Sequence, residues 1–489
     1  MAIRISHRRP AGGALLGLLL LLQPSMAMAA PAVDASLGIL RQRLERLGDR
    51  LEQNARRLTL QEAVVLGLQR QPRLAREYDQ LQALQWQGIA IRREWSPSLL
   101  ADNDDPGLVG WRRVRERDSS NDTLDGVSIT NNLRSSTYGV PRLTLDWSFF
   151  DPSRTPRLRS NLAGQQAQEL LFDITARDLI LDIQSRYYAL QRLQELEQSY
   201  RTLYKLAGSL ANAAGGNEQL RTEELALVQI RVRTHDDLVR TGAQLAELLS
   251  LPPGDLALPA EPLQASGEWP LDRVATLTEA LALREEIRRS LAGADGLSWS
   301  ARAVQSRYLP SLGLRGQLKA ELENYSLESL EAPSSSTSGG NGNLRLDGGL
   351  QWHWRLFDGG VLGAEATALR RQADQALQQA ALDRLTVTRQ VESSHASYTT
   401  SQILLDSTRV QLQSARAALD NGRRNFRGDA NDATTLVQNI EKLRQALESE
   451  AVAREQHNTA LAELYRYSAR WPEGAPSLVD QRRQELRQR

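Results

Sequence analysis

The feature that most constrains this chain is a long internal repeat. Three short phrases recur in the same order, at nearly constant spacing, in the two halves of the 489 residues. The matching pairs are residues 58–63 with 277–281, residues 95–99 with 308–312, and residues 147–151 with 354–358. A unit of this length is far longer than a solenoid repeat, so it indicates a duplicated half and not a stacked array.

Each half contains segments in which apolar and polar residues alternate. They are residues 143–149, 312–319 and 344–356. This alternation predicts strands with one apolar and one polar face, and aromatic residues gather at one end, as in a barrel with lipid outside and water inside. A half-buried strand of a soluble sheet shows the same alternation, and the flanking helices and an export signal favour the barrel. Polar loops are predicted at residues 101–137 and 320–343, and a weakly patterned first strand between residues 98 and 114.

After each aromatic-Asp corner the spacing of apolar residues becomes helical. Steps of three and four over residues 362–380 and 436–451 are typical of a narrow coiled-coil seam. We expect two long helices and two shorter returning helices. Their predicted ranges are residues 156–212 with a return to 251, and residues 359–427 with a return to 469.

Both kinds of element are incomplete in a single copy. A helix of about 69 residues would be a rod on the order of 100 Å long, which one protomer of this size cannot bury. Three or four strands cannot close a barrel. Association of several copies around an axis would complete both, and this inference rests on the residues alone.

The N-terminal residues predict export from the cytoplasm. Three arginines precede a short apolar stretch and a small-x-small site near Ala29, so residues 1–29 are interpreted as a signal peptide. A membrane anchor is the alternative, but the apolar stretch is too short to span a bilayer. The chain has no cysteine, which excludes disulfide scaffolds, thiolate metal sites and thiol nucleophiles. The net charge of +1 is evenly mixed and gives no basic block for nucleic acid.

No pattern of catalytic chemistry stands out. The five histidines lack metal-ligand spacing, and neither a phosphate-binding loop nor a nucleophile elbow occurs. The acidic run at residues 102–105 lacks the spacing of a calcium loop, and a solvated loop is the better interpretation. We therefore expect no enzyme activity, no cofactor and no metal.

The chain resembles the outer-membrane efflux protein family, the TolC-like channels. The resemblance runs from Leu58 to Pro472. The phrases that carry it are residues 58–63 and 71–74, the two Pro-Ser-Leu strand starts, residues 356–360, residues 463–466, and Trp471-Pro472.

The resemblance implies a homotrimer in the outer membrane with a long periplasmic extension. Each chain would give four strands to one shared β-barrel and its hairpins to a helical tunnel, completed by helices at residues 60–93 and 276–307. Such a channel passively conducts substrate in a tripartite efflux or type I secretion system. Its partners are a periplasmic adaptor, an inner-membrane transporter and outer-membrane lipid.

Two groups of site residues follow. The hairpin tips, at the gated entrance and adaptor-docking surface, are Gly215, Gly216, Asn217, Arg427, Gly428, Asp429 and Asp432. The barrel-to-helix corners are Trp147, Phe150, Asp151, Trp354, Phe357 and Asp358. Neither tip has the Val-Gly-Leu-like phrase of the family. The entrance aspartates of some members fall here on Thr434 and Val437, so an aspartate ring is not expected, and a solvated turn and helix cap explain Asp429 and Asp432 better.

The predicted fold class is mainly α with a small β part. Its predicted divisions are a signal peptide (1–29), an amphipathic extension (30–57), a first repeat (58–255), a linker (256–270), a second repeat (271–472) and a polar tail (473–489). The alternative function is a periplasm-spanning coiled-coil structural or adaptor protein without a pore. Such a protein would not place alternating strands beside its hairpins twice.

Overall fold

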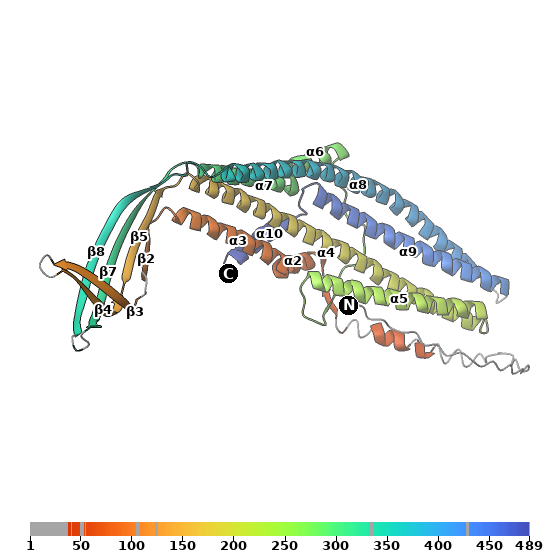
Figure 1. Ribbon diagram of the computed structural model, residues 1–489. Coiled ribbons are helices and arrows are strands. Elements are labelled where there is room, and N and C mark those ends of the chain that lie inside the picture. The colour runs from red at the N-terminus through yellow and green to blue at the C-terminus, as the bar shows by residue number, and fades with distance from the viewer. Residues whose placement is uncertain are drawn as a thin grey trace, which may run out of the picture.

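The computed structural model describes residues 38–40, 42–48, 53, 55–103, 108–122, 126–331, 334, 336–426 and 430–488. The predicted signal peptide, residues 1–29, lies outside the described residues. The fold is mainly helical with one large sheet, as the sequence predicted. Figure 1 shows an elongated molecule with the sheet at one end and long helices running away from it. No described helix combines the length and the apolar character needed to cross a membrane.

Two helical hairpins form the body of the rod. They are α4 (Arg154–Ala213) with α5 (Glu218–Leu248), and α8 (Val361–Asn425) with α9 (Ala430–Tyr467). With 60 residues in α4 and 65 in α8, these helices are about 90–100 Å long at 1.5 Å per residue. The predicted seam of α8 is confirmed, since Leu362, Ala366 and Ala380 are all buried. Small side chains at these positions let neighbouring helices approach closely.

Two pairs of shorter helices flank the long ones. They are α2 (Leu60–Arg70) with α3 (Pro72–Arg93), and α6 (Arg273–Leu283) with α7 (Glu285–Ser306). Each pair bends at a single extended residue, Gln71 in the first and Arg284 in the second. Pro72 explains the first bend, because a proline disfavours helical backbone at the residue before it.

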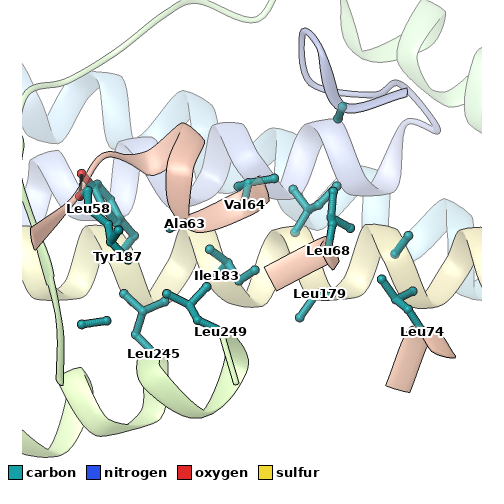
Figure 2. Close-up of a cluster of buried hydrophobic side chains, with 14 of the residues drawn as sticks. Leu58, Ala63, Val64, Leu68, Leu74, Leu179, Ile183, Tyr187, Leu245 and Leu249 are labelled. Atoms are coloured by element: carbon teal, nitrogen blue, oxygen red, sulfur yellow. Dashed lines mark hydrogen bonds between the residues drawn. The ribbon is translucent and has the colours of Figure 1, made fainter. Parts of the chain in front are cut away.

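The largest hydrophobic core lies midway along the rod. Here α4 presents Leu179, Ile183 and Tyr187 at helical spacing to residues of α2 and α5. Figure 2 shows Ile183 next to Leu249, which follows α5, and Tyr187 next to Leu58. A second core joins both hairpins nearer their tips. The two hairpins therefore form one packed body.

The large sheet contains four strand paths. The first runs through β2 (Ser98–Asn103) and β3 (Gly110–Asp122), and the second through β4 (Gly126–Gly139) and β5 (Pro141–Phe150). The others are β7 (Ser311–Ser329) and β8 (Ser336–His353). All neighbours are antiparallel, with β7 paired on one side to β5 and β4 and on the other to β8. Within the chain the outer sides of the first path and of β8 have no strand partner among the described residues.

The predicted polar loops are largely strand. β3 and β4 fill most of residues 101–137, and β7 and β8 extend deep into residues 320–343. The hydrophobic pattern could not show this, because both faces of the sheet are polar there. Backbone hydrogen bonds alone continue the pairing, and they leave no mark on side-chain periodicity.

The order of elements in the first half recurs in the second. The first residues of α2 and α6, of α3 and α7, and of β2 and β7 are 213 positions apart in each case. Thr59 caps α2 in a capping box with Glu62, as predicted. Its structural counterpart is Asp272, which caps α6, whereas Thr278 lies inside that helix. The sequence match of 58–63 with 277–281 was therefore displaced by six residues at its threonine.

Two segments outside the repeats carry structure of their own. Within the predicted linker, β6 (Leu256–Pro259) pairs in parallel with β1 (Ala55–Leu58). The predicted polar tail forms α10 (Ala475–Arg487), which buries Val479 and Leu486 in the largest core. Both segments are too short for their periodicity to stand out in the sequence.

Candidate functional site

One face of the sheet is apolar and exposed. Leu143, Leu318 and Leu346 lie side by side across three strand paths, and Trp147, Leu314 and Leu350 form a parallel row. The exposed fraction reaches 79% at Leu346 and 67% at Leu350. A folded protein rarely leaves a continuous apolar surface of this kind in water, so the face is built for an apolar environment.

The opposite face is polar and charged. Arg142 donates two hydrogen bonds to the carboxylate of Asp102, at 2.8 and 2.7 Å. Arg315 of β7 binds Asp146 of β5 at 2.6 Å. Asp102, the first residue of the acidic run weighed as a calcium site, is thus occupied by an arginine; Asp104 and Asp105 lie outside the described residues. The two faces have the asymmetry of a wall between water and an apolar medium.

The strand-to-helix corners are built alike in both halves. The indole N–H of Trp147 donates to the carbonyl of Trp95, and that of Trp354 donates to the carbonyl of Tyr308, both at 2.9 Å. The first bond joins the end of β5 to the segment after α3, and the second joins the residue after β8 to the segment after α7. The predicted corner tryptophans therefore fix the angle between sheet and helices.

The corner aspartates hold the starts of the long helices. The Asp151 carboxylate accepts from the backbone N–H of Ser153 at 2.9 Å. Asp358 accepts from the N–H groups of Gly360 and Leu362, both at 2.9 Å. These bonds satisfy amides that a helix start leaves free. Phe150 and Phe357 instead project outward, with 47% and 86% of their surface exposed.

The first hairpin tip is a tight turn closed by glycine. Gly215 and Gly216 have positive φ values of 65° and 88°. The N–H of Gly216 donates to the carbonyl of Ala211 at 2.9 Å, which gives the helix end its hydrogen-bonded cap. Asn217 then caps α5 by accepting from Gln219 N at 3.0 Å.

The second tip lies at the same end of the rod (Figure 1). The Thr434 hydroxyl donates to the side-chain oxygen of Gln219 at 2.9 Å, which joins the two tips directly. Asp432 belongs to the first turn of α9. The other predicted residues of this tip, Arg427, Gly428 and Asp429, lie outside the described residues.

A substitution at the first tip tests the importance of its geometry. We expect Gly216→Ala to destabilise the α4–α5 hairpin by about 1 kcal/mol, because a side chain disfavours left-handed backbone. Gly164→Ala, inside α4 with free space around it, should be neutral or stabilising. Denaturant midpoints of the helical circular-dichroism signal compare the two. Equal effects would contradict this account of the tip.

Residues 276–470 match the family model described as outer membrane efflux protein. The predicted resemblance to that family is confirmed. The name of the family places its members in the outer membrane, which agrees with the predicted location. No curated protein matches the chain by sequence.

Solved structures of outer-membrane channels share the fold of this chain. The Campylobacter jejuni channel CmeC is 14% identical, with a TM-score of 0.63 over 87% of this chain and 89% of CmeC. The open state of the Neisseria gonorrhoeae channel MtrE is 17% identical, with a TM-score of 0.61 over 84% and 89%. The OprN channel gives 17%, 0.63, 84% and 89% for the same quantities. At these identities the likeness establishes the fold.

A buried charged cluster that no sequence pattern predicted lies where α4 and α7 meet the segment after α9. Arg177 of α4 binds Glu285 at 3.0 Å and donates to the carbonyls of Ala469 and Arg470, both at 2.8 Å. Its guanidinium lies 3.8 Å from the ring centre of Trp471. No local signal marks Arg177, because Asp173 and Asp178 stand near it in the sequence as they would on a solvated helix face.

The cluster continues to a second pair of arginines. Arg284 and Arg466 both bind Glu286, at 2.8 and 2.6 Å. Although burial raises the pKa of Glu286, these two arginines hold it at about 2. Arg466 also reaches Asp178 of α4 at 2.6 Å. The cluster thus fastens the end of α9 to the first and second repeats at once.

The docking of α10 adds a pH-dependent contact. Burial raises the pKa of Asp173 from 3.8 to about 6, and the negative charges of Glu285 and Asp480 also raise it. The positive charges of its partner Arg483 and of Arg177 act in the opposite direction and lower this pKa. A raised pKa in the folded state means that stability is present in full below pH 4 and is lost as pH rises through 6.

We therefore expect the free energy of unfolding to fall by up to about 3 kcal/mol between pH 4 and pH 7 on account of Asp173. Asp173→Asn should lack this component. Urea titrations of both proteins at a series of pH values measure it. The two curves running parallel across that range would refute the assignment.

Proposed function

We propose that the chain is the outer-membrane duct of a tripartite efflux or type I secretion system. In this proposal three copies form one barrel and one helical tunnel, and substrate passes passively from a periplasmic adaptor and inner-membrane transporter to the exterior. The proposal also takes the repeated order of elements as an internal duplication. The single observation that carries it is the sheet, apolar on one exposed face and charged on the other, fixed at its corners to two long hairpins.

The open sides of the sheet support a closed assembly. Four strand paths are too few to close a barrel, and both outer paths lack a strand partner within the described chain. Three copies would give an even number of strands, twelve by the resemblance, with no free edge. The apolar face would meet lipid, and the face with Arg142 and Arg315 would line the water-filled lumen.

The long helices point to the same assembly. Leu385, Ile403 and Val410 lie along one side of α8, opposite its buried seam, with 65–69% of their surface exposed. Contact with a neighbouring copy would cover this side. The tips, joined by Thr434 and Gln219, would then surround the periplasmic entrance and face the adaptor.

The test combines membrane extraction with conductance. The chain expressed with its N-terminal segment should fractionate with outer membranes, migrate as a heat-modifiable trimer and conduct ions in planar bilayers. A soluble monomer without channel activity would instead support a coiled-coil structural or adaptor protein.

Engineered disulfides can test the closure directly, because the natural chain has no cysteine. Ala101 of β2 and the outward residues of β8 lie at opposite sides of one sheet, about 14 Å apart at strand spacing, which is too far for an internal bridge. Ala101→Cys is combined in turn with a cysteine at each position of β8 on the face that carries Leu346. At least one of these pairs should yield covalent trimers. Ala101→Cys with a cysteine at Leu385 is the control. Absence of linked species across the whole panel would contradict the closed sheet.

A further inference from the structure

Three arginines of β3 occupy alternate positions on one face of the sheet. Arg113, Arg115 and Arg117 are all exposed. They share their face with Trp111, because residues two apart on a strand point to the same side. Trp111 pairs with Thr137, whose neighbour on β7 is Asn324. Asn324 lies on the same face of β7 as Leu314, Leu318 and Leu322, because these positions are an even number of residues apart. The arginines, which share their face with Trp111, therefore lie on the apolar face and not on the charged one.

Their position along the strand is just beyond the apolar band. The band begins at the row of Leu312 and Trp352 and reaches Leu322. Trp111, with 81% of its surface exposed, marks its end. From Leu312 to the row of Trp111 is about 40 Å along the strand, or about 30 Å across a bilayer at the usual tilt of a barrel strand. The arginines therefore begin where lipid headgroups would lie.

Among the described residues, the carboxylates near these arginines are fewer than the arginines themselves. Their register partners on β4 are Ser135, Leu133 and Asn131. On β7 the same face carries Ser326 and Glu328, and the Glu331 carboxylate accepts from the side chain of Asn131, so described side chains at this height contribute three positive charges and two negative charges per copy. By contrast, Arg134 on the opposite face binds Glu323 at 3.0 Å and Glu116 at 3.7 Å. The sheet pairs Arg134 with two carboxylates, whereas the three outer arginines keep an excess of one positive charge per copy.

We infer that Arg113, Arg115 and Arg117 form a binding surface for phosphorylated, anionic lipid headgroups of the outer leaflet. This rests on the proposed function, which places the apolar face in lipid and the β3–β4 turn outside. Guanidinium groups bind phosphate oxygens in paired hydrogen bonds. Alternate positions on one strand lie about 7 Å apart, so the row can span several headgroup phosphates. The surface holds a collar of lipid around the barrel at its outer rim.

The experiment measures binding of diphosphoryl lipid A to the purified, detergent-solubilised full-length trimer by native mass spectrometry. The test variant replaces Arg113, Arg115 and Arg117 by Gln. Each arginine near an anionic surface contributes about fivefold in affinity, so the triple variant should bind on the order of 100-fold more weakly. The corresponding triple Lys variant should retain most of the binding, because attraction by charge persists. Wild-type binding should weaken as salt is raised.

A matched control removes the same charge elsewhere. Arg384, Arg409 and Arg416 are exposed on α8, and their replacement by Gln should leave lipid binding unchanged. Wild-type affinity in the β3 Gln variant, or an equal loss in the α8 control, overturns the inference. These outcomes are separate from a failure of the proposed function, in which the wild type itself forms no trimer and conducts no ions.

Discussion

Leu318→Arg is expected to prevent stable assembly in the outer membrane, whereas Gln317→Arg is expected to be tolerated. The two positions are neighbours on β7, and their side chains point to opposite faces. Leu318 lies between Leu143 and Leu346 in the apolar face, and Gln317 between Thr144 and Asp347 in the polar face. An arginine facing lipid near the middle of a bilayer costs about 2–4 kcal/mol in each copy, and three copies share one barrel.

The measurement is the fraction of each variant recovered from outer membranes as a heat-modifiable trimer. Leu318→Gln should give an intermediate result, because an uncharged polar group costs less to bury in lipid than a charge. Gln317→Arg should assemble normally and alter ion selectivity, since it adds a positive charge to the lumen. Similar recovery of Leu318→Arg and Gln317→Arg would show that the two faces do not meet different environments, and the duct proposal would fail.

Arg177→Met is expected to destabilise the molecule by about 3–5 kcal/mol, the range for breaking a buried ion pair by removing one partner. The Arg177 side chain is 4% exposed, and its partner Glu285 is 9% exposed. Loss of the guanidinium leaves a buried carboxylate without its counter-ion. It also releases the carbonyl of Ala469, a non-glycine residue held at a φ of 68°. The turn after α9 should therefore loosen first.

A double-mutant cycle separates the two contributions. Arg177→Met with Glu285→Gln should recover part of the loss, because no unpaired charge remains buried. Arg240→Met is the control, since the Arg240–Asp236 pair is 67% and 65% exposed and such pairs contribute about 0–1 kcal/mol. Urea midpoints of the helical signal are compared for the wild type, the two single variants, the double variant and the Arg240→Met control. A loss for Arg177→Met no larger than for Arg240→Met would show that the cluster is not a structural fastening.

The sequence predicted the elements whose side chains repeat a pattern. The seam of α8 and the alternation of β8 could be predicted because burial against one neighbour selects apolar residues at a fixed period. The corner tryptophans and aspartates were predicted as sites from their repetition alone. Their hydrogen bonds to Tyr308, Trp95 and the helix starts give that repetition a physical cause.

Elements held by backbone pairing or by distant partners could not be predicted this way. The polar ends of β3 and β7 carry no alternation, because both of their faces are polar. Arg177 and Glu285 are 108 positions apart, and no local pattern shows that one buried charge will meet another.

The sequence by itself thus determined the repeated passage from strand to long helix and the deficits that call for several copies. Those features depend on local periodicity and on the lengths of elements, which neighbouring residues encode. Only the tertiary structure decided that β4 and β5 both pair with β7, that Thr434 bonds to Gln219 between the tips, and that Arg113, Arg115 and Arg117 lie on the apolar face of the sheet. Register and long-range charge pairing arise between segments far apart in the chain, so they become visible only when the chain is folded.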